Sequence, residues 1–154
     1  SFDIFVSTYP NIQPESKNYQ KDIYWLNKKF EAGASRGITQ YFYNSNSYLY
    51  FVEQCKKSGI EAPIIPGIMP ITNYHNLVRF SENCGADIPR WIQKRLHQYG
   101  DDTESIKDFG LDVVTHLCEE LLENNAPGLH FYTMNQADVN LTLCNRLGFS
   151  LANA

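Results

Sequence analysis

The sequence predicts an α/β fold in which four short parallel strands alternate with helices. Two observations lead to this fold class. Strand-like apolar segments and amphipathic helical segments alternate along the 154 residues, with one helical insertion before the last strand. Hydrophobic residues make up 43% of the chain and charged residues 19%, the balance of a globular domain with a real core. Strands that alternate with helices are joined by right-handed crossovers, so we expect a parallel sheet.

Each expected strand is a short run rich in β-branched and aromatic residues, bounded by glycine, proline or polar residues. Prolines bracket the third strand, because proline is tolerated at strand ends and not in strand interiors. The four strands are expected near residues 3–7, 37–42, 63–66 and 128–133. They should pair in sequence order.

Helical spacing of apolar residues and suitable cap residues define the intervening helices. The first helix carries Ile23, Leu26 and Phe30 on one face. The longest carries the stripe Ile106, Phe109, Val113, Val114, Leu117 and Leu121. The expected amino-terminal residues of the later helices are Ser47, Thr72 or Asn73, Pro89, Asp101 or Asp102, and Asn135. The glycines expected to end helices are Gly33, Gly59 and Gly148.

Two architectures fit four such units. One is a small open sheet covered by helices on both faces, and the other is half of an eight-stranded barrel, which as a whole has roughly 250 residues. Periodicity does not choose between them. A glycine-rich phosphate loop would favour the open sheet, and neither of its two usual patterns occurs in the sequence.

Composition and charge exclude several function classes. Thirteen Lys and Arg stand against seventeen Asp and Glu, with a net charge of −4, so there is no cationic excess for nucleic acid. No apolar run approaches the ~20 residues of a membrane span, and the first residues do not resemble a signal peptide. We therefore expect a cytoplasmic protein that binds neither nucleic acid nor membrane.

The cysteines and histidines give no metal site. Cys55, Cys84, Cys118 and Cys144 are far apart and form no CxxC pair, so buried thiols are favoured over disulfides or metal ligands. The four histidines also lack zinc-ligand spacing, and His130 is interpreted as a strand histidine held by hydrogen bonds. No bound metal is expected.

Ligands of parallel α/β sheets bind at the carboxyl ends of the strands. Amides, hydroxyls and aromatic rings gather there, and the set contains no carboxylate pair and no nucleophile–histidine pair. Such a lining suits a flat heteroaromatic ligand and does not suit hydrolysis by side chains. These candidates are Ser7, Thr8, Tyr9, Gln40, Tyr41, Tyr43, residues 66–70, Tyr132, Asn135 and Gln136.

Several candidates keep a second interpretation on pattern alone. Gln40 is a ligand-directed amide or a glutamine at the wet end of its strand. Phe80 shares a face with Asn73 and Asn76, where it stacks on a ligand or contacts the next helix. Tyr132 touches a ligand or caps a barrel rim.

Lys28 and Lys29, late in the first helix, also keep two interpretations. They could meet an anionic group. Lysines in the last turn of a helix also complement its dipole while they face solvent, and spacing alone favours this second interpretation.

In series, these segments resemble the methylenetetrahydrofolate reductase family. The specific stretches are residues 36–42 (RGITQYF), 64–70 (IIPGIMP) and 129–135 (LHFYTMN), with residues 22–33, 47–48, 73–74 and 88–91 between them. The match extends from Ser1 nearly to the last residue. It implies the carboxyl-terminal half of a (βα)8 barrel, so residues 1–154 are expected to form a single partial domain.

The resemblance also implies the reaction. In that family NADH or NADPH reduces FAD, and reduced FAD passes a hydride to 5,10-methylenetetrahydrofolate, giving 5-methyltetrahydrofolate. The expected cofactor is FAD. The expected partners are methylenetetrahydrofolate, NADH or NADPH, the missing amino-terminal half of the barrel, and further copies in a homo-oligomer.

The resemblance assigns site residues one by one. The folate and NADH positions are Gln40, Asn76, Phe80, Tyr132 and Gln136, and the FAD positions are Tyr9, Asp22, Trp25, Lys28 and Lys29. Three of these residues depart from the family pattern. Trp25 replaces an Asn, Asn76 replaces a Gln, and Gln136 replaces an Arg, which removes a charge.

The glutamate that assists folate protonation in the family lies on the first barrel strand, which this chain does not contain. No catalytic residue is therefore expected in this chain, which alone should not catalyse the reaction. The competing hypothesis is a non-catalytic α/β module that has lost the flavin half and serves in binding or assembly.

Overall fold

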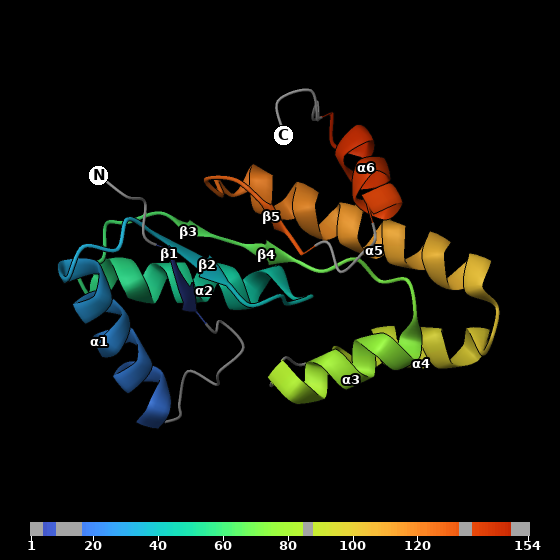
Figure 1. The fold of residues 1–154 in the computed structure, drawn as a ribbon, viewed down its shortest axis with the longest axis horizontal. Helices are drawn as coiled ribbons and strands as arrows, with labels where there is room; N and C mark the ends of the chain where they lie inside the picture. Colours follow the sequence, from blue (N-terminus) through green and yellow to red (C-terminus); the bar gives the residue numbers. More distant parts are fainter. Residues whose placement is uncertain (1–4, 9–16, 85–87, 133–136, 149–154) are drawn as a thin grey trace.

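The computed structural model describes residues 5–8, 17–84, 88–132 and 137–148 as an α/β protein. Figure 1 shows the strands running through the middle of the molecule, with α1 at one end and α3 and α4 at the other. The elements in order are β1 Phe5–Thr8, α1 Lys17–Glu31, β2 Arg36–Thr39, α2 Ser45–Lys57, β3 Ile64–Ile65, β4 Gly67–Ile68, α3 Tyr74–Cys84, α4 Arg90–Tyr99, α5 Thr103–Glu123, β5 His130–Phe131 and α6 Ala137–Arg146.

The strand pairs in the described residues are parallel and follow the sequence order, as predicted, but they form two sheets, β1–β2–β3 and β4–β5, instead of the single sheet expected. Strand β2 pairs with β1 on one side and with β3 on the other, and β4 pairs with β5. The predicted third strand is divided in two at Pro66: β3 pairs with β2, whereas the Pro66 carbonyl accepts the His130 N–H on the β5 side. The strands are also shorter than predicted. Strand β2 ends at Thr39, and residues 40–43 continue into the core without strand pairing.

The main helices are arranged in the same order as the strands. Helix α2 contacts α1 and α5, and α5 also contacts α4 and α6. Helix α5 is therefore the crossover that leads to β5, and α3 with α4 is the predicted insertion. This insertion begins just after Ile71, and α5 returns to that residue: a Cβ on Gly110 would lie 2.3 Å from the Ile71 carbonyl oxygen.

Helix ends test the cap predictions. Asp102 caps α5 through the Ser105 N–H, and Asn73 receives the Asn76 N–H at the start of α3, both as predicted. The prediction for α2 is wrong: Asn44, not Ser47, is its cap, because its side-chain oxygen accepts the Asn46 N–H one turn earlier than expected.

Three further helix ends lie at or next to the residues predicted for them. Pro89 immediately precedes α4 instead of occupying its first position. Gly33 and Gly59, which follow α1 and α2, have φ values of 118° and 87°, a conformation that glycine adopts without strain. The predicted cap Asn135 lies outside the described residues.

The core lies between the strands and the helices that cover them. Its members include Ile23, Leu26, Tyr41, Phe42, Tyr48, Phe51, Ile64, Ile68, Leu117 and Leu121. Full burial of one Leu, Ile or Phe side chain contributes about 1.5–3 kcal/mol, so this cluster is the main source of stability. Phe109 and Val113, predicted for the buried stripe of α5, are half-buried and pack against the cluster. Within the described part of the chain, no helix is long and apolar enough to cross a membrane.

The described cysteines are free thiols. Cys55, Cys118 and Cys144 are buried, which confirms the prediction for these three. Burial raises the pKa of Cys55 to about 12, and burial followed by the nearby Cys144 and Glu119 raises the pKa of Cys118 to about 12. Among the described residues there is no group of three His, Cys, Asp or Glu side chains suited to a metal ion.

Candidate functional site

Thr39, at the carboxyl end of β2, connects three other strand segments. Its backbone pairs with Thr8 of β1. Its Oγ1 accepts the Gly67 N–H of β4 at 2.8 Å, and its carbonyl oxygen accepts the Tyr132 hydroxyl, just after β5, at 2.8 Å. Thr39 is fully buried and its bond to Gly67 is shielded from water, whereas Tyr132 is half-buried. We call Thr39, Gly67 and Tyr132 the Thr39 junction.

The junction is packed too tightly for a side chain on Gly67. A Cβ there would lie 2.2 Å from the Thr39 carbonyl oxygen and 2.7 Å from Cε2 of Tyr132. The His130 ring meets the Tyr132 ring edge-on at 4.9 Å between centroids. The Tyr132 ring is therefore held by contacts on more than one side.

Gln40 directly follows the junction and is half-buried. Its side-chain oxygen accepts the Tyr41 N–H at 3.3 Å. Because Tyr132 donates to the carbonyl of the preceding residue, the Gln40 backbone lies beside the Tyr132 hydroxyl at the carboxyl ends of β2 and β5.

Helix α3 approaches the same region. The Tyr41 and Ser81 hydroxyls lie 2.9 Å apart, both buried, which ties α3 to the segment after β2. The backbone of Phe80 directly precedes Ser81, and the side chain of Phe80 lies outside the described residues. Asn76, one turn earlier on α3, is exposed. Gln136 also lies outside the described residues.

Tyr43 is the other tyrosine predicted at this end of the sheet. Its hydroxyl donates to the Met69 carbonyl at 3.2 Å. Burial, and then the neighbouring Tyr41, raise the pKa of Tyr43 well above its usual value. Tyr43 is therefore a neutral hydrogen-bond donor in the core, and its hydroxyl anchors the segment after β4.

The residues predicted to bind FAD lie apart from these, on α1. Asp22, Lys28 and Lys29 are exposed, and Trp25 is 55% exposed. Lys28 Nζ lies 3.3 Å from Glu31 and 5.4 Å from the centroid of the Tyr24 ring, which Trp25 meets edge-on. Tyr9 lies outside the described residues. The outer face of α1 therefore presents an aromatic pair beside two ammonium groups.

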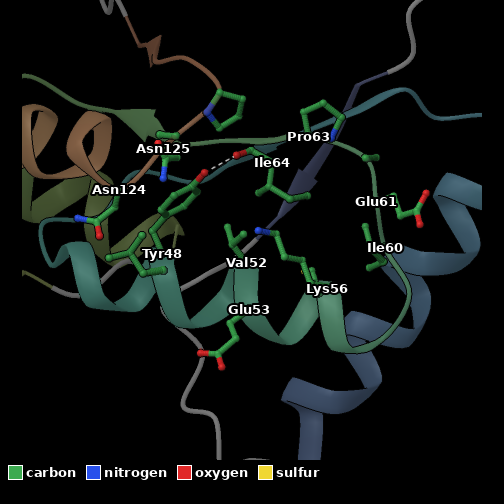
Figure 2. A pocket seen from close by; sticks show the side chains of 15 residues that line it. Tyr48, Val52, Glu53, Lys56, Ile60, Glu61, Pro63, Ile64, Asn124 and Asn125 are labelled. Carbon is green, nitrogen blue, oxygen red and sulfur yellow. Dashed lines mark hydrogen bonds between the residues drawn. The ribbon is translucent and has the colours of Figure 1, made fainter.

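A cavity of about 680 Å³ lies at the opposite, amino ends of the strands. It is bounded by α2, by residues 60–64 before β3 and by residues 124–127 before β5. Figure 2 shows Lys56 reaching into this space beside Val52, whereas Glu53 points away. The Tyr48 hydroxyl donates to the Ile64 carbonyl across its wall. The cavity includes neither Gln40 nor Tyr132.

The sequence interpretation did not single out Thr39, and it included Gly67 only within the candidate range 66–70. The available signal was the place of both residues in two of the family stretches, residues 36–42 and 64–70.

Two exposed grooves lie on the helical side of the molecule. One runs between the start of α2 and helices α4 and α5, and the other is formed by Tyr74 and α4.

Comparisons with known proteins agree with the motifs. A model of the family described as "Methylenetetrahydrofolate reductase" matches residues 1–148. A 5,10-methylenetetrahydrofolate reductase of Buchnera aphidicola subsp. Schizaphis graminum is 44% identical over 147 residues, which are 96% of this chain and 50% of that protein. The Escherichia coli reductase is 37% identical over the same shares. The chain thus spans about half the length of the curated relatives that it matches.

A solved structure shares the fold. It is an uncharacterized protein from Clostridium thermocellum that binds two copies of 5-methyl-5,6,7,8-tetrahydrofolic acid. Its TM-score is 0.60 at 18% identity, and the match covers 94% of this chain and 52% of that one.

Proposed function

Because the chain belongs to the methylenetetrahydrofolate reductase family, we propose that it supplies half of the (βα)8 barrel of a flavin-dependent reductase. That enzyme reduces 5,10-methylenetetrahydrofolate to 5-methyltetrahydrofolate with electrons from NADH or NADPH. Parallel strands in sequence order, with helices α1, α2, α5 and α6 in the same order, support a barrel segment. The match to about half the length of the relatives supports the same interpretation.

One observation carries the assignment of the folate site. The bond from the Tyr132 hydroxyl to the carbonyl of Thr39, the residue directly before Gln40, holds Tyr132 next to the Gln40 backbone at the carboxyl edge of the strands. In barrels of this class, ligands bind at that edge. The cavity in Figure 2 lies at the other end of the strands. Its lining includes none of the residues that the resemblance assigns to the folate, NADH or FAD sites, so we do not assign it to the reaction.

In the proposed site, Gln40 orients the pterin or the nicotinamide. Its amide both donates and accepts hydrogen bonds, which matches the edge of either heterocycle. Tyr132 and Phe80 supply aromatic surface for the folate or the NADH, and Asn76 and Gln136 supply further polar groups. An amide held in one orientation lowers the barrier because it needs no reorganisation during reaction.

The exposed face of α1 fits the dinucleotide FAD. Lys28 and Lys29 suit its pyrophosphate, and the exposed ring of Trp25 offers a surface for stacking. Lys28 is available because its pair with Glu31 joins two side chains that are 49% and 57% exposed, and such pairs are weak. Bound FAD would supply the hydride chemistry of the reaction. Asp22 and Tyr9 complete the proposed set.

A hybrid enzyme tests the proposal. The matched half of the Buchnera reductase is replaced by this chain, and the purified hybrid is assayed for NADH oxidation that depends on methylenetetrahydrofolate. We expect a yellow, active protein. The isolated chain should be inactive even with added FAD, because the glutamate that assists protonation lies outside it. A colourless, inactive hybrid that folds would instead favour the non-catalytic binding or assembly module.

Gln40→Ala in the active hybrid tests the central residue. We expect kcat/KM for the folate to fall about tenfold or more, since an oriented amide hydrogen bond is lost. The control is Gln93→Ala, because Gln93 donates to the Ile88 carbonyl on the exposed side of α4. Equal folate rates for Gln40→Ala and the parent would contradict the role of Gln40.

A further inference from the structure

We propose that Thr39 is a positioning residue that fixes Gln40 and Tyr132 relative to one another in the substrate site. The inference rests on the function proposed above, because that function makes Gln40 and Tyr132 contact the folate. It assigns to Thr39 no contact with the substrate itself. Thr39 acts through the residues bonded to it.

The first step of the argument is the interrupted ladder. Strands β2 and β3 pair as far as Ile38 and Ile65, and the carbonyl of the next residue, Pro66, faces β5, where it accepts the His130 N–H. The next donor, Gly67 N–H, is met by the Thr39 side chain instead of a backbone carbonyl. The Thr39 hydroxyl therefore holds β4 against β2 where backbone pairing has stopped.

The second step is the peptide plane between Thr39 and Gln40. The Thr39 carbonyl, which accepts the Tyr132 hydroxyl, lies in the same rigid plane as the Gln40 nitrogen. A bond that fixes this carbonyl also fixes the direction in which the chain enters Gln40. Because its hydroxyl donates to Thr39, Tyr132 meets a ligand mainly through its ring.

The third step is that the two bonds act together. Gly67 lies against both the Thr39 carbonyl and the Tyr132 ring, with no room for a Cβ. If the Thr39 hydroxyl is removed, the buried Gly67 N–H loses its acceptor, and the strand that abuts the Tyr132 ring is released. The positions of Gln40 and Tyr132 relative to one another are then no longer fixed.

The chain offers matched variants for the test. Thr39→Val keeps the shape and removes the hydroxyl, whereas Thr39→Ser keeps the hydroxyl. Thr115→Val is the control, because Thr115 Oγ1 on α5 is buried and has no hydrogen-bond partner within the described residues. All three are made in the hybrid reductase, in the parent background and with Gln40→Ala.

In the parent background we expect Thr39→Val to lower kcat/KM for methylenetetrahydrofolate about tenfold, the effect of one well-placed hydrogen bond. The Kd of 5-methyltetrahydrofolate, measured by calorimetry, should rise by a similar factor. Thr39→Ser and Thr115→Val should stay within about twofold of the parent. In the Gln40→Ala background, Thr39→Val should add a clearly smaller loss than in the parent, since one of the two residues through which it acts is gone.

Equal losses from Thr39→Val in the two backgrounds would show a structural role only and overturn the inference, as would a Thr39→Val variant as active as the parent. A second readout does not depend on folate turnover. With glutamine side-chain amides labelled with ¹⁵N, the Gln40 signal should broaden or shift in Thr39→Val and not in Thr115→Val. An unchanged Gln40 signal would overturn the inference even if the hybrid lacked reductase activity, whereas an inactive parent hybrid alone contradicts the proposed function.

Discussion

The two ends of the strands are built in different ways. At the carboxyl ends, three strand segments meet in the buried Thr39 junction, and hydrogen bonds set the geometry. At the amino ends, a cavity of about 680 Å³ separates α2 from the segments that lead into β3 and β5. The amino-end cavity is therefore not the better candidate for chemistry. The comparison teaches that convergence of oriented polar groups is a more informative sign of a site than empty volume.

The largest expected effect concerns the tight packing at the carboxyl ends. Gly67→Ala places a Cβ against the Thr39 carbonyl and the Tyr132 ring, and the backbone oxygen cannot move aside. We expect a loss of about 3 kcal/mol in the free energy of unfolding, measured in urea. Gly128→Ala is the control, since nothing lies within 4 Å of its added Cβ, and it should change stability by less than about 0.5 kcal/mol. Equal stabilities would mean that the junction is loosely packed.

The next effect concerns the wall of the amino-end cavity. Tyr48→Phe removes the hydrogen bond to the Ile64 carbonyl and should cost about 1 kcal/mol of unfolding free energy. Burial, and then Cys55, raise the pKa of Tyr48 to about 12. Because its pKa is raised in the folded state, Tyr48 contributes fully to the free energy of unfolding below pH 10. This contribution is lost as the pH rises towards 12. In Tyr48→Phe the free energy of unfolding should therefore decrease less between pH 10 and pH 12 than in the parent. An equal decrease in both proteins would contradict the prediction.

A smaller effect separates buried thiols from accessible ones. Cys55 and Cys118 have a pKa of about 12, so almost no thiolate is present at pH 8. We expect both to resist iodoacetamide in the native protein and to react in urea, as followed by mass spectrometry of the peptides. Rapid native labelling of Cys55, which lines the cavity, would indicate that the amino end opens to solvent.

The smallest effect tests the division between the two ends directly. Lys56→Gln removes the cationic group that reaches into the amino-end cavity. We expect kcat and KM of the hybrid for the folate to change by less than about twofold. Lys56 lies at the opposite ends of the strands from the proposed site, and its exposed charge is screened by solvent and salt. A larger change in KM would bring the amino-end cavity into the reaction.

Sequence patterns predicted most of the scaffold. Alternation gave the parallel strands in order, and Asp102 and Gly59 marked helix ends correctly. The mistakes have local causes. Asn44 and Ser47 are both good caps, and only the tertiary fold selects the earlier one. The β2–β3 ladder stops at Ile65 because the Gly67 N–H bonds to the Thr39 side chain instead of the Thr39 carbonyl, so the aromatic residues after Thr39 enter the core outside any strand.

The site was predictable to a lesser degree. Family motifs named Gln40 and Tyr132, and both lie beside Thr39 in the structure, although their role stays a prediction. The junction itself was not predictable, because Thr39 and Tyr132 are far apart in sequence and a buried hydroxyl shared between strands leaves no periodic signal. Such a contact depends on three-dimensional register alone.

The close approach of Gly110 to Ile71 has a consequence for how this family can be rebuilt. Residues 72–109 leave the scaffold and return to it at nearly the same point, so the excursion has its two ends side by side. It carries α3, whose Ser81 is joined to Tyr41 next to Gln40. Its ends are adjacent, but Leu77, Ile92, Leu96 and Ile106 belong to the core cluster, so an exchange has to keep apolar side chains at these positions. Residues 72–109 thus form a cassette, through which one wall of the proposed site could be transplanted from one relative to another.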